Sequence, residues 1–375
     1  MRVIGAEIGG AGLAVSFGDA MPTVFPWMWL RDHGEDAESL DPGTWQRKVD
    51  TFAIEADLRG VGVETIDDGA RLRVTWSDNS PPSEFSARLL AEMAGLTPGE
   101  DDPGAGLDRN LWAAGSLPAA MPSVGFDAVM SGDAGMRRWL ENIHVWGFSL
   151  VHDMPASEEG TKRLAERMGY VRQTIFGGLW TLSAEVKDHG DTAYTTQYLE
   201  PHTDSTYCHD APGLQLFNCI EFDGRGGESV LVDGFALAER LRAGRPDDFE
   251  TLTRTMVPGR YVEPGVHLRA ERPPFRLDRR GRLEQVTFNN YDRAPFMLPP
   301  AEMVAFYRAY GAYHEAVVDQ RNWLKIRLEP GFALIFDNWR LLHGRMGYTG
   351  KRVFCGCYHN REDFESRLRT VRPAA

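Results

Sequence analysis

The chain has 375 residues, of which 42% are hydrophobic and 25% charged, a balance typical of a folded globular protein and not of a disordered or fibrous one. Its 54 acidic residues outnumber its 41 Lys and Arg, so the formal net charge is −13. This charge disfavours general binding to nucleic acid or to an anionic membrane, and an anionic small molecule would need a local basic pocket.

The cysteines and the N-terminus bear on the cellular location. The 4 cysteines form no CxxC pair and suggest no disulfide framework, which favours a reducing compartment. The N-terminal stretch places Glu7 among its apolar residues and lacks the basic start and small-residue cleavage site of a secretory signal. No run approaches the roughly 18 apolar residues needed to cross a bilayer. We therefore expect a cytoplasmic protein that does not enter a membrane.

The first part of the chain, residues 1–96, alternates short extended runs with turns, which predicts a small β-rich domain. Its expected strands are 12–17, 49–54 and 70–76. Residues 97–121 are rich in Pro, Gly and Asp, the composition of a linker. A boundary in this stretch leaves residues 122–375 as a second, larger domain.

The second domain is predicted to be mainly β with flanking helices. Apolar residues spaced three and four apart predict helices at 136–142, 158–168, 234–242 and 300–319. Short apolar or alternating runs predict strands at 147–152, 213–220, 227–233, 331–336 and 351–358.

An HxD motif, His202-Thr203-Asp204, offers two candidate metal ligands. Side chains alternate along an extended segment, so His202 and Asp204 would point the same way. A distant histidine on a late strand, His343, would complete a set of two imidazoles and one carboxylate. Such a set suits a redox iron that must also bind a co-substrate and oxygen. Arg352 follows on the next strand and would reach the same cavity.

The HxD pattern occurs more than once in this chain. His189-Gly190-Asp191 also fits, and His33-Gly34-Glu35 is a near match. Charged residues and a glycine surround His189, which indicates a turn. His202 instead lies between an extended run and a strongly apolar strand, where a ligand at the mouth of a β structure is expected. The context therefore favours the motif at 202–204.

Several segments in both predicted domains match one known family in the same order. They are WLRDH (29–33), DTAYTTQYLEPHTDSTY (191–207), PGLQLFNCI (212–220), GGESVLVDGF (226–235), FNNYDRA (288–294), FDNWRLLHGR (336–345) and CGCYHNREDF (355–364). The chain resembles the γ-butyrobetaine hydroxylase and trimethyllysine dioxygenase family, within the taurine-dioxygenase-like Fe(II)/2-oxoglutarate dioxygenases.

The resemblance implies a double-stranded β-helix, or jelly roll, as the catalytic domain. It implies Fe(II) on His202, Asp204 and His343, and a bidentate pair between Arg352 and the distal carboxylate of 2-oxoglutarate. Ser229 would add a hydroxyl to this co-substrate, or else be satisfied by its own strand. The implied reaction uses O2 to hydroxylate a C–H bond and converts 2-oxoglutarate to succinate and CO2.

The resemblance also implies a small quaternary-ammonium substrate. Four aromatic residues match the family's cage, which binds such a cation through ring quadrupoles: Phe176, Trp180, Tyr194 and Tyr358. Ordinary core aromatics are the alternative explanation. The polar end of the substrate would meet Asp191, Asn289, Asn290 or Arg293.

Three substrates fit this family: N6-trimethyllysine, γ-butyrobetaine and, by similarity to a short bacterial relative, 2-trimethylaminoethylphosphonate. Asp191 favours the trimethyllysine branch, because a carboxylate there suits an α-ammonium group. Zinc-bearing members carry cysteines in the N-terminal domain, whereas the first cysteine here is Cys208, so a zinc-free domain is expected. The resemblance also suggests a homodimer.

Two other function classes compete with this interpretation. A zinc-binding β-barrel, hydrolytic or non-catalytic, could use the same three ligands, since zinc accepts histidine and carboxylate. Alternatively, the N-terminal domain could serve as a partner-binding surface. Arg352 and the run of matching segments favour the dioxygenase.

Overall fold

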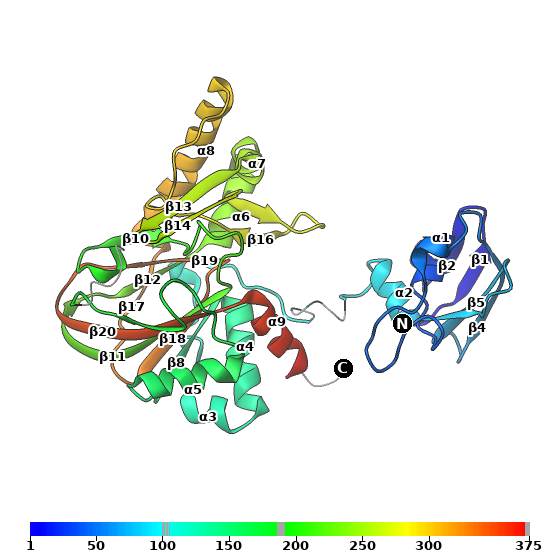
Figure 1. Ribbon diagram of the computed structural model, residues 1–375, viewed down its shortest axis with the longest axis horizontal. Helices are drawn as coiled ribbons and strands as arrows, with labels where there is room; N and C mark the ends of the chain where they lie inside the picture. Colours follow the sequence, from blue (N-terminus) through cyan, green and yellow to red (C-terminus); the bar gives the residue numbers. More distant parts are fainter. Residues whose placement is uncertain (100–101, 103, 105, 186–191, 372–375) are drawn as a thin grey trace. The chain divides into compact units, whose positions relative to one another are not determined.

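The computed structural model describes residues 1–99, 102, 104, 106–185 and 192–371. The chain divides into two compact units, Met1–Gly106 and Leu107–Ala375 (Figure 1).

The first unit contains two three-stranded antiparallel sheets. One sheet has the order β1-β2-β3, with β1 (Gly5–Ile8), β2 (Gly12–Ser16) and β3 (Thr23–Pro26). The other has the order β4-β5-β6, with β4 (Gly60–Ile66), β5 (Arg71–Trp76) and β6 (Ser83–Ser86). Two short helices, α1 (Trp27–Asp32) and α2 (Ala87–Met93), share their apolar core, in which Leu13, Leu72 and Phe85 have no exposed surface. The predicted strands at 12–17 and 70–76 are confirmed.

The predicted strand at 49–54 is wrong. This stretch forms a 3₁₀ helix, η1 (Thr51–Ala53), whose preceding Asp50 side chain accepts a hydrogen bond from the Phe52 amide. Phe52 is 98% exposed whereas Ile54 packs against the core, so the apolar residues of this stretch do not share one buried face as those of a strand would.

Two facing sheets form the second unit, and all their strand pairs are antiparallel except β7 with β8. The larger sheet has the order β7-β8-β18-β11-β20-β9, with β7 (Ser123–Gly125), β8 (Phe148–His152), β18 (Phe332–Asp337), β11 (Leu214–Gly226), β20 (Tyr348–His359) and β9 (Leu179–Leu182). The smaller has the order β10-β19-β12-β17, with β10 (Leu199–His202), β19 (Leu341–Arg345), β12 (Ser229–Asp233) and β17 (Leu324–Ile326). This arrangement is the expected double-stranded β-helix.

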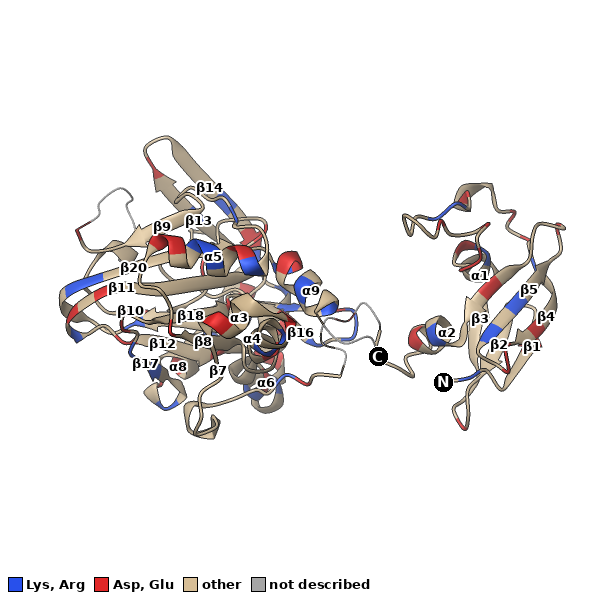
Figure 2. Ribbon diagram, turned by 90° about the horizontal axis from the view of Figure 1, so that it is seen from below, with Lys and Arg blue, Asp and Glu red and all other residues tan. Residues whose placement is uncertain are grey.

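Helices cover the outer faces of both sheets (Figure 1). The larger sheet packs against α3 (Phe126–Ser131), α4 (Asp133–Trp146), α5 (Glu158–Met168) and α9 (Arg361–Thr370). The smaller packs against α6 (Gly234–Gly244), α7 (Pro246–Arg254) and α8 (Pro300–Val318). Figure 2 shows acidic and basic residues along α5 and α9, whose apolar residues face the sheet. Two hairpins, β13 (Val257–Glu263) with β14 (Val266–Arg272) and β15 (Phe275–Leu277) with β16 (Leu283–Val286), complete the unit.

Strand β18 shows how one strand serves two cores. Ala333 and Ile335 pack under the helices of the larger sheet, whereas Leu334 and Phe336 point into the space between the sheets. All four are fully buried, so the strand appears in the sequence as a continuous apolar run. Side chains from both sheets meet in this inner space, and it holds the pocket described below.

The stretch at 107–121, predicted as part of a linker, packs on the second unit. The Trp112 amide donates to the Asp233 carboxylate at 3.0 Å, and the Arg340 guanidinium donates to the Asn110 carbonyl at 2.6 Å. Arg340 and Asp233 themselves form a buried ion pair. The Pro, Gly and Asp content therefore indicated irregular backbone rather than a loose connection. None of the described helices has the length and apolar character needed to span a bilayer.

Candidate functional site

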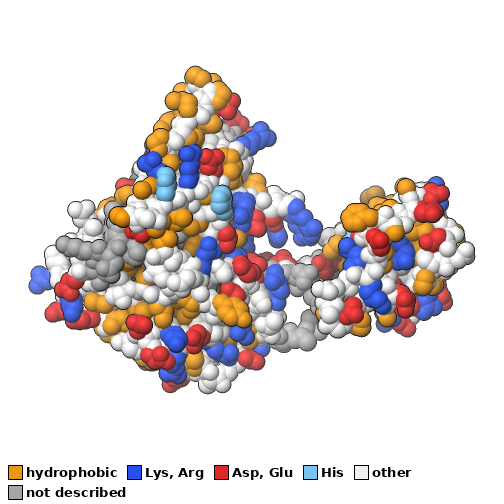
Figure 3. Space-filling view, in the orientation of Figure 1, with side chains coloured by type: hydrophobic (Ala, Val, Ile, Leu, Met, Phe, Trp, Pro, Cys, Tyr) orange, Lys and Arg blue, Asp and Glu red, His pale blue; other side chains and the backbone are white. Residues whose placement is uncertain are grey.

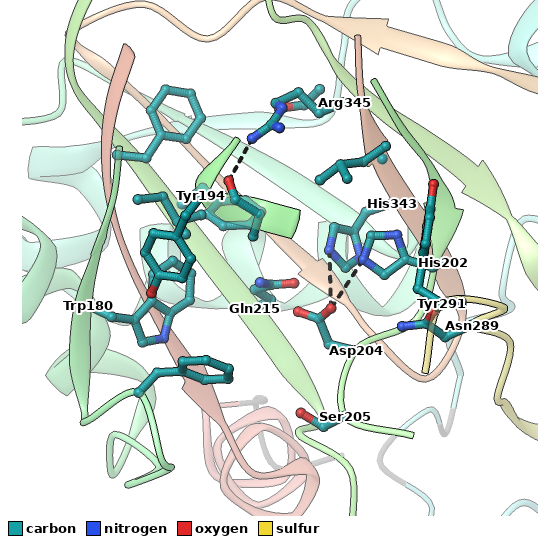
Figure 4. Close-up of a pocket in the computed structure, with 18 of the residues that line it drawn as sticks. Trp180, Tyr194, His202, Asp204, Ser205, Gln215, Asn289, Tyr291, His343 and Arg345 are labelled. Atoms are coloured by element: carbon teal, nitrogen blue, oxygen red, sulfur yellow. Dashed lines mark hydrogen bonds and ion pairs between the residues drawn. The ribbon is translucent and has the colours of Figure 1, made fainter. Parts of the chain in front are cut away.

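One pocket lies between the two sheets of the second unit (Figure 4). Its walls include most of the residues expected from the sequence: Phe176, Trp180, Tyr194, His202, Asp204, Ser229, Asn289, His343, Arg352 and Tyr358. In Figure 4, Trp180 and Tyr194 lie on one side of the pocket, and His202, His343 and Asp204 lie on the other.

The fold brings the two histidines together through one strand pair. His202 ends β10 and is the direct antiparallel partner of His343 in β19. Asp204 follows two residues later, just before Ser205, which adopts a positive φ of 58°. This sharp turn ends the extended segment after the second candidate ligand.

His202, Asp204 and His343 converge on one point. Each offers one ligand atom, and these atoms lie within 4.8 Å of one another. Oδ1 of Asp204 is 3.4 Å from Nε2 of His202 and 3.6 Å from Nε2 of His343. Among the residues that the structure describes, this is the one group of at least three such side chains that converges in this way.

Hydrogen bonds and burial prepare the imidazoles to bind a metal. Nδ1 of His202 lies 2.7 Å from the Glu200 carbonyl oxygen, so Nδ1 carries the proton and Nε2 keeps its lone pair. Burial lowers the pKa of His343 to about 4, which keeps this imidazole neutral at pH 7. Burial also opposes a charge on His202, but the hydrogen bond and charge of Asp204 raise its pKa. Protons therefore compete with a metal mainly at His202.

Asp204 is held in place by three contacts besides the histidines. Its amide donates to the Asn338 side-chain oxygen at 2.8 Å, and its carbonyl accepts from the Asn338 Nδ2 at 3.4 Å. Its Oδ2 accepts from the Tyr358 hydroxyl at 2.7 Å. Burial opposes ionisation of Asp204, but His343, His202 and the Tyr358 hydroxyl hold its pKa below the usual value. The carboxylate is therefore charged and fixed at neutral pH.

Arg352 supplies a buried positive charge to the same pocket. It is 6% exposed, and its Nε has no hydrogen-bond partner among the described residues. Burial and the nearby charge of Arg345 lower its pKa to about 10. Its guanidinium lies 3.7 Å over the Phe354 ring centroid, and Ser229 lines the same pocket. An anion with two oxygens would satisfy this guanidinium, because burial without a partner is costly.

Trp180 forms an aromatic wall with residues from neighbouring strands. Its ring centroid lies 5.5 Å from that of Tyr358 and 5.6 Å from that of Phe217. The indole lies directly over Gly356, its partner in the β9–β20 pair. A Cβ on Gly356 would come within 2.1 Å of the indole, so only glycine leaves room for this wall. Phe176 and Tyr194 also line the pocket.

The segment after β16 contributes different residues from those expected. Asn289 lines the pocket, and its Oδ1 accepts hydrogen bonds from the Tyr291 and Asp292 amides at 2.9 and 3.3 Å. This side-chain-capped turn brings Tyr291 and Asp292 into the pocket wall. Asn290 is exposed, and neither it nor Arg293 lines the pocket.

Arg293 instead lies beside α8. Its Nε donates to Oδ1 of Asn290 at 3.2 Å, and its guanidinium lies over the rings of Tyr307 and Tyr310. Asp191, the other residue expected at the polar end of the substrate, lies outside the described residues.

Two further pocket residues were not predicted, although strand alternation indicates both. Gln215 points inward from β11 with Phe217, two residues later. Arg345 lies two residues after His343 on β19 and therefore shares its face. The Arg345 guanidinium donates to the carbonyls of Ala193, Thr195 and Gln197 at 2.9, 2.6 and 3.0 Å. It thereby holds the segment that carries Tyr194.

The donor set fits a particular cofactor chemistry. Two imidazoles and one carboxylate on one side of a pocket leave several coordination positions for other ligands, the pattern of non-haem Fe(II) oxygenases. The buried Arg352 nearby fits a dicarboxylate co-substrate.

Comparison with known proteins agrees with this pattern. Residues 113–358 match the taurine catabolism dioxygenase TauD, TfdA family. The chain is 34% identical to a trimethyllysine dioxygenase of Meyerozyma guilliermondii, covering 98% of this chain and 95% of that protein. It is 33% identical to a mitochondrial trimethyllysine dioxygenase of Homo sapiens, covering 92% and 82%. It is 30% identical to a gamma-butyrobetaine dioxygenase of Pseudomonas sp. (strain AK-1), covering 96% and 93%. The chain therefore belongs to the TauD/TfdA family, with the trimethyllysine and γ-butyrobetaine dioxygenases, and is a non-haem Fe(II)- and 2-oxoglutarate-dependent dioxygenase.

Proposed function

We propose that the protein hydroxylates a C–H bond of N6-trimethyllysine. The observation that carries this proposal is an aromatic wall around Trp180 in the same pocket as a converged His, Asp and His set. The similarity to two trimethyllysine dioxygenases over more than nine-tenths of this chain supports the choice of substrate.

In this proposal His202, Asp204 and His343 hold Fe(II), and Arg352 with Ser229 binds the distal carboxylate of 2-oxoglutarate. The iron supplies the activation of O2, coupled to conversion of 2-oxoglutarate to succinate and CO2. The residues of the chain bind and orient the reactants and keep bulk water away from the pocket. Cys219 and Phe354, buried around Arg352, give its charge a poorly hydrated environment in which a carboxylate binds strongly.

The trimethylammonium group would lie against Trp180, with Phe176, Tyr194 and Tyr358 around it. A quaternary ammonium cannot donate a hydrogen bond, so ring faces are the groups that recognise its charge. The tight packing of the indole over Gly356 fixes the position of one such face before the substrate arrives.

At the other end of the substrate, carboxylates would recognise the α-ammonium group. Asp292 lines the pocket and accepts a hydrogen bond from Asn289 Nδ2 at 2.8 Å. Asp191, outside the described residues, is a second candidate. γ-Butyrobetaine and 2-trimethylaminoethylphosphonate have no such amine and present an anion at this end. The Asp292 carboxylate in this pocket wall therefore favours the amino-acid substrate.

The test measures succinate formation and product mass with N6-trimethyllysine, γ-butyrobetaine and 2-trimethylaminoethylphosphonate in parallel. We expect the highest kcat/KM and a product one oxygen atom heavier with N6-trimethyllysine. Preferential hydroxylation of either of the other two compounds would refute this substrate. In the same assay, Asp292→Asn should lower kcat/KM for N6-trimethyllysine and leave kcat/KM for the two compounds without an α-amine equal or improved.

We also propose that the protein forms a homodimer. An apolar surface on and near α8 supports this: Met297, Val304 and Tyr307 are 83, 70 and 53% exposed, and Figure 3 shows hydrophobic side chains over this helix. Size-exclusion chromatography with light scattering tests the homodimer, and a monomeric mass at micromolar concentration would contradict it.

A cytoplasmic location is a further proposal. It is supported by 4 cysteines that form no disulfide, and cell fractionation tests it.

A further inference from the structure

The two oxygens of the Asp204 carboxylate face different partners. Oδ1 faces Nε2 of both histidines, at 3.4 and 3.6 Å. Oδ2 accepts a hydrogen bond from the Tyr358 hydroxyl at 2.7 Å. Oδ1 is therefore the oxygen that faces the place where the three side chains converge.

The sheet register fixes the position of this phenol. Tyr358 in β20 is the direct partner of Gln215 in β11, so both side chains project into the space between the sheets. Gln215 is 2% exposed, and its Nε2 lies 3.4 Å from the Tyr358 hydroxyl oxygen. An ionised Asp204 carboxylate can only accept, so the phenol donates its single proton to Oδ2. The phenol oxygen then accepts from the Gln215 amide nitrogen.

The same tyrosine also belongs to the aromatic wall. Its ring lies 5.5 Å from that of Trp180, and only 5% of Tyr358 is exposed. One buried side chain thus contacts the carboxylate with its hydroxyl and lines the pocket with its ring.

We propose that Tyr358 is a positioning residue for the metal-binding carboxylate. Its hydroxyl engages Oδ2, so that Asp204 binds the metal through Oδ1 alone and leaves a coordination position for 2-oxoglutarate and oxygen. Hydrogen bonds to ligating carboxylates raise metal affinity because they fix the ligand before the metal arrives. The inference rests on Asp204 as an iron ligand, which the proposed function assumes, and not on the choice of substrate.

The test is Tyr358→Phe, which keeps the ring and removes the hydroxyl. Metal affinity is measured without 2-oxoglutarate or substrate, by the loss of the free Mn(II) paramagnetic resonance signal and by anaerobic Fe(II) titration. We expect the affinity for both ions to fall about tenfold.

The matched control is Tyr313→Phe. Tyr313 is 1% exposed and donates to the Gly234 carbonyl at 3.1 Å, away from the pocket walls. This variant also loses one buried phenol hydrogen bond, so it reports the general loss of stability without touching Asp204. We expect it to lower Tm and leave metal affinity unchanged.

The outcomes of these variants separate the two proposals. Unchanged Mn(II) and Fe(II) affinity in Tyr358→Phe would overturn the positioning role, as would equal losses of affinity in Tyr358→Phe and Tyr313→Phe. Normal metal affinity in Asp204→Ala would instead overturn the metal ligands of the proposed function. If Asp204→Ala loses metal binding and Tyr358→Phe keeps the parent metal affinity, the assignment of the ligands holds and only the role of Tyr358 is refuted.

Discussion

His202 and His343 are direct partners across the antiparallel pair of β10 and β19, with ring centroids 4.5 Å apart. Two candidate ligands that are distant in sequence thus become neighbours through the register of one strand pair. A slip of one residue would turn His343 outward and bring Leu342, which packs under the helices of the smaller sheet, into the pocket. The convergence of the metal ligands therefore depends on this register.

Asp204→Ala and His343→Ala should each abolish turnover and lower metal affinity, because each removes one of three proposed ligands. The fold should persist, since neither side chain belongs to the apolar core. Succinate release, Mn(II) binding and circular dichroism measure the three effects. His267→Ala, a change at an exposed histidine outside the pocket, is the control and should match the parent protein. Iron-dependent succinate formation above a trace in either ligand variant would contradict the assignment.

Arg352→Ala should raise the apparent KM for 2-oxoglutarate far more than that for the primary substrate. Removing one partner of a buried, hydrogen-bonded charge pair costs about 2–5 kcal/mol. Arg352→Lys keeps the charge but loses the two-pronged donor, so an intermediate KM is expected. Steady-state kinetics with each substrate varied in turn provide the measurement. An unchanged KM for 2-oxoglutarate would mean that another cation binds its distal carboxylate.

Trp180→Ala should weaken binding of a trimethylammonium substrate by about 1–2 kcal/mol, the strength of a desolvated cation–π contact. Gly356→Ala should act in the same direction without removing any aromatic group, because a Cβ there would displace the indole. Isothermal titration calorimetry on the metal-loaded protein without oxygen measures the substrate affinity of both variants. The control ligand replaces trimethylammonium by a neutral tert-butyl group. If the parent protein binds both ligands equally, the wall is merely apolar.

The sequence predicts the sheets well where strands are buried on both faces. The runs at 213–220 and 331–336 are confirmed as β11 and β18, and the helix expected at 158–168 is confirmed as α5. These elements combine strong apolar patterns with clear ends, such as the Ser157 cap that accepts from the Gly160 amide. Local pattern and tertiary packing favour the same structure there.

The pocket is harder to predict, because its walls depend on turns and register rather than on periodicity. Asn290 and Arg293 were expected beside Asn289, but the Asn289 side chain caps a turn that points Asp292 inward instead. Arg345 appears in the sequence as one more arginine after His343. Only the approach of residues 193–197 to the end of β19 gives its guanidinium three carbonyl partners.

Those three carbonyl contacts lead to the last prediction. Arg345→Ala should free the segment that carries Tyr194 and so raise the KM for the trimethylammonium substrate. Loss of hydrogen bonds from a charged donor costs about 1.5–3 kcal/mol, which corresponds to a rise of roughly tenfold or more. The KM for 2-oxoglutarate should change much less, because Arg352, and not Arg345, is the proposed partner of its carboxylate. Arg345→Lys should not restore the parent KM, since one ammonium group cannot reach three carbonyls in the geometry of a planar fork. Kinetics with each substrate varied separately distinguish the two arginines. A larger rise for 2-oxoglutarate than for the trimethylammonium substrate would assign Arg345 to the co-substrate and refute its role in holding Tyr194.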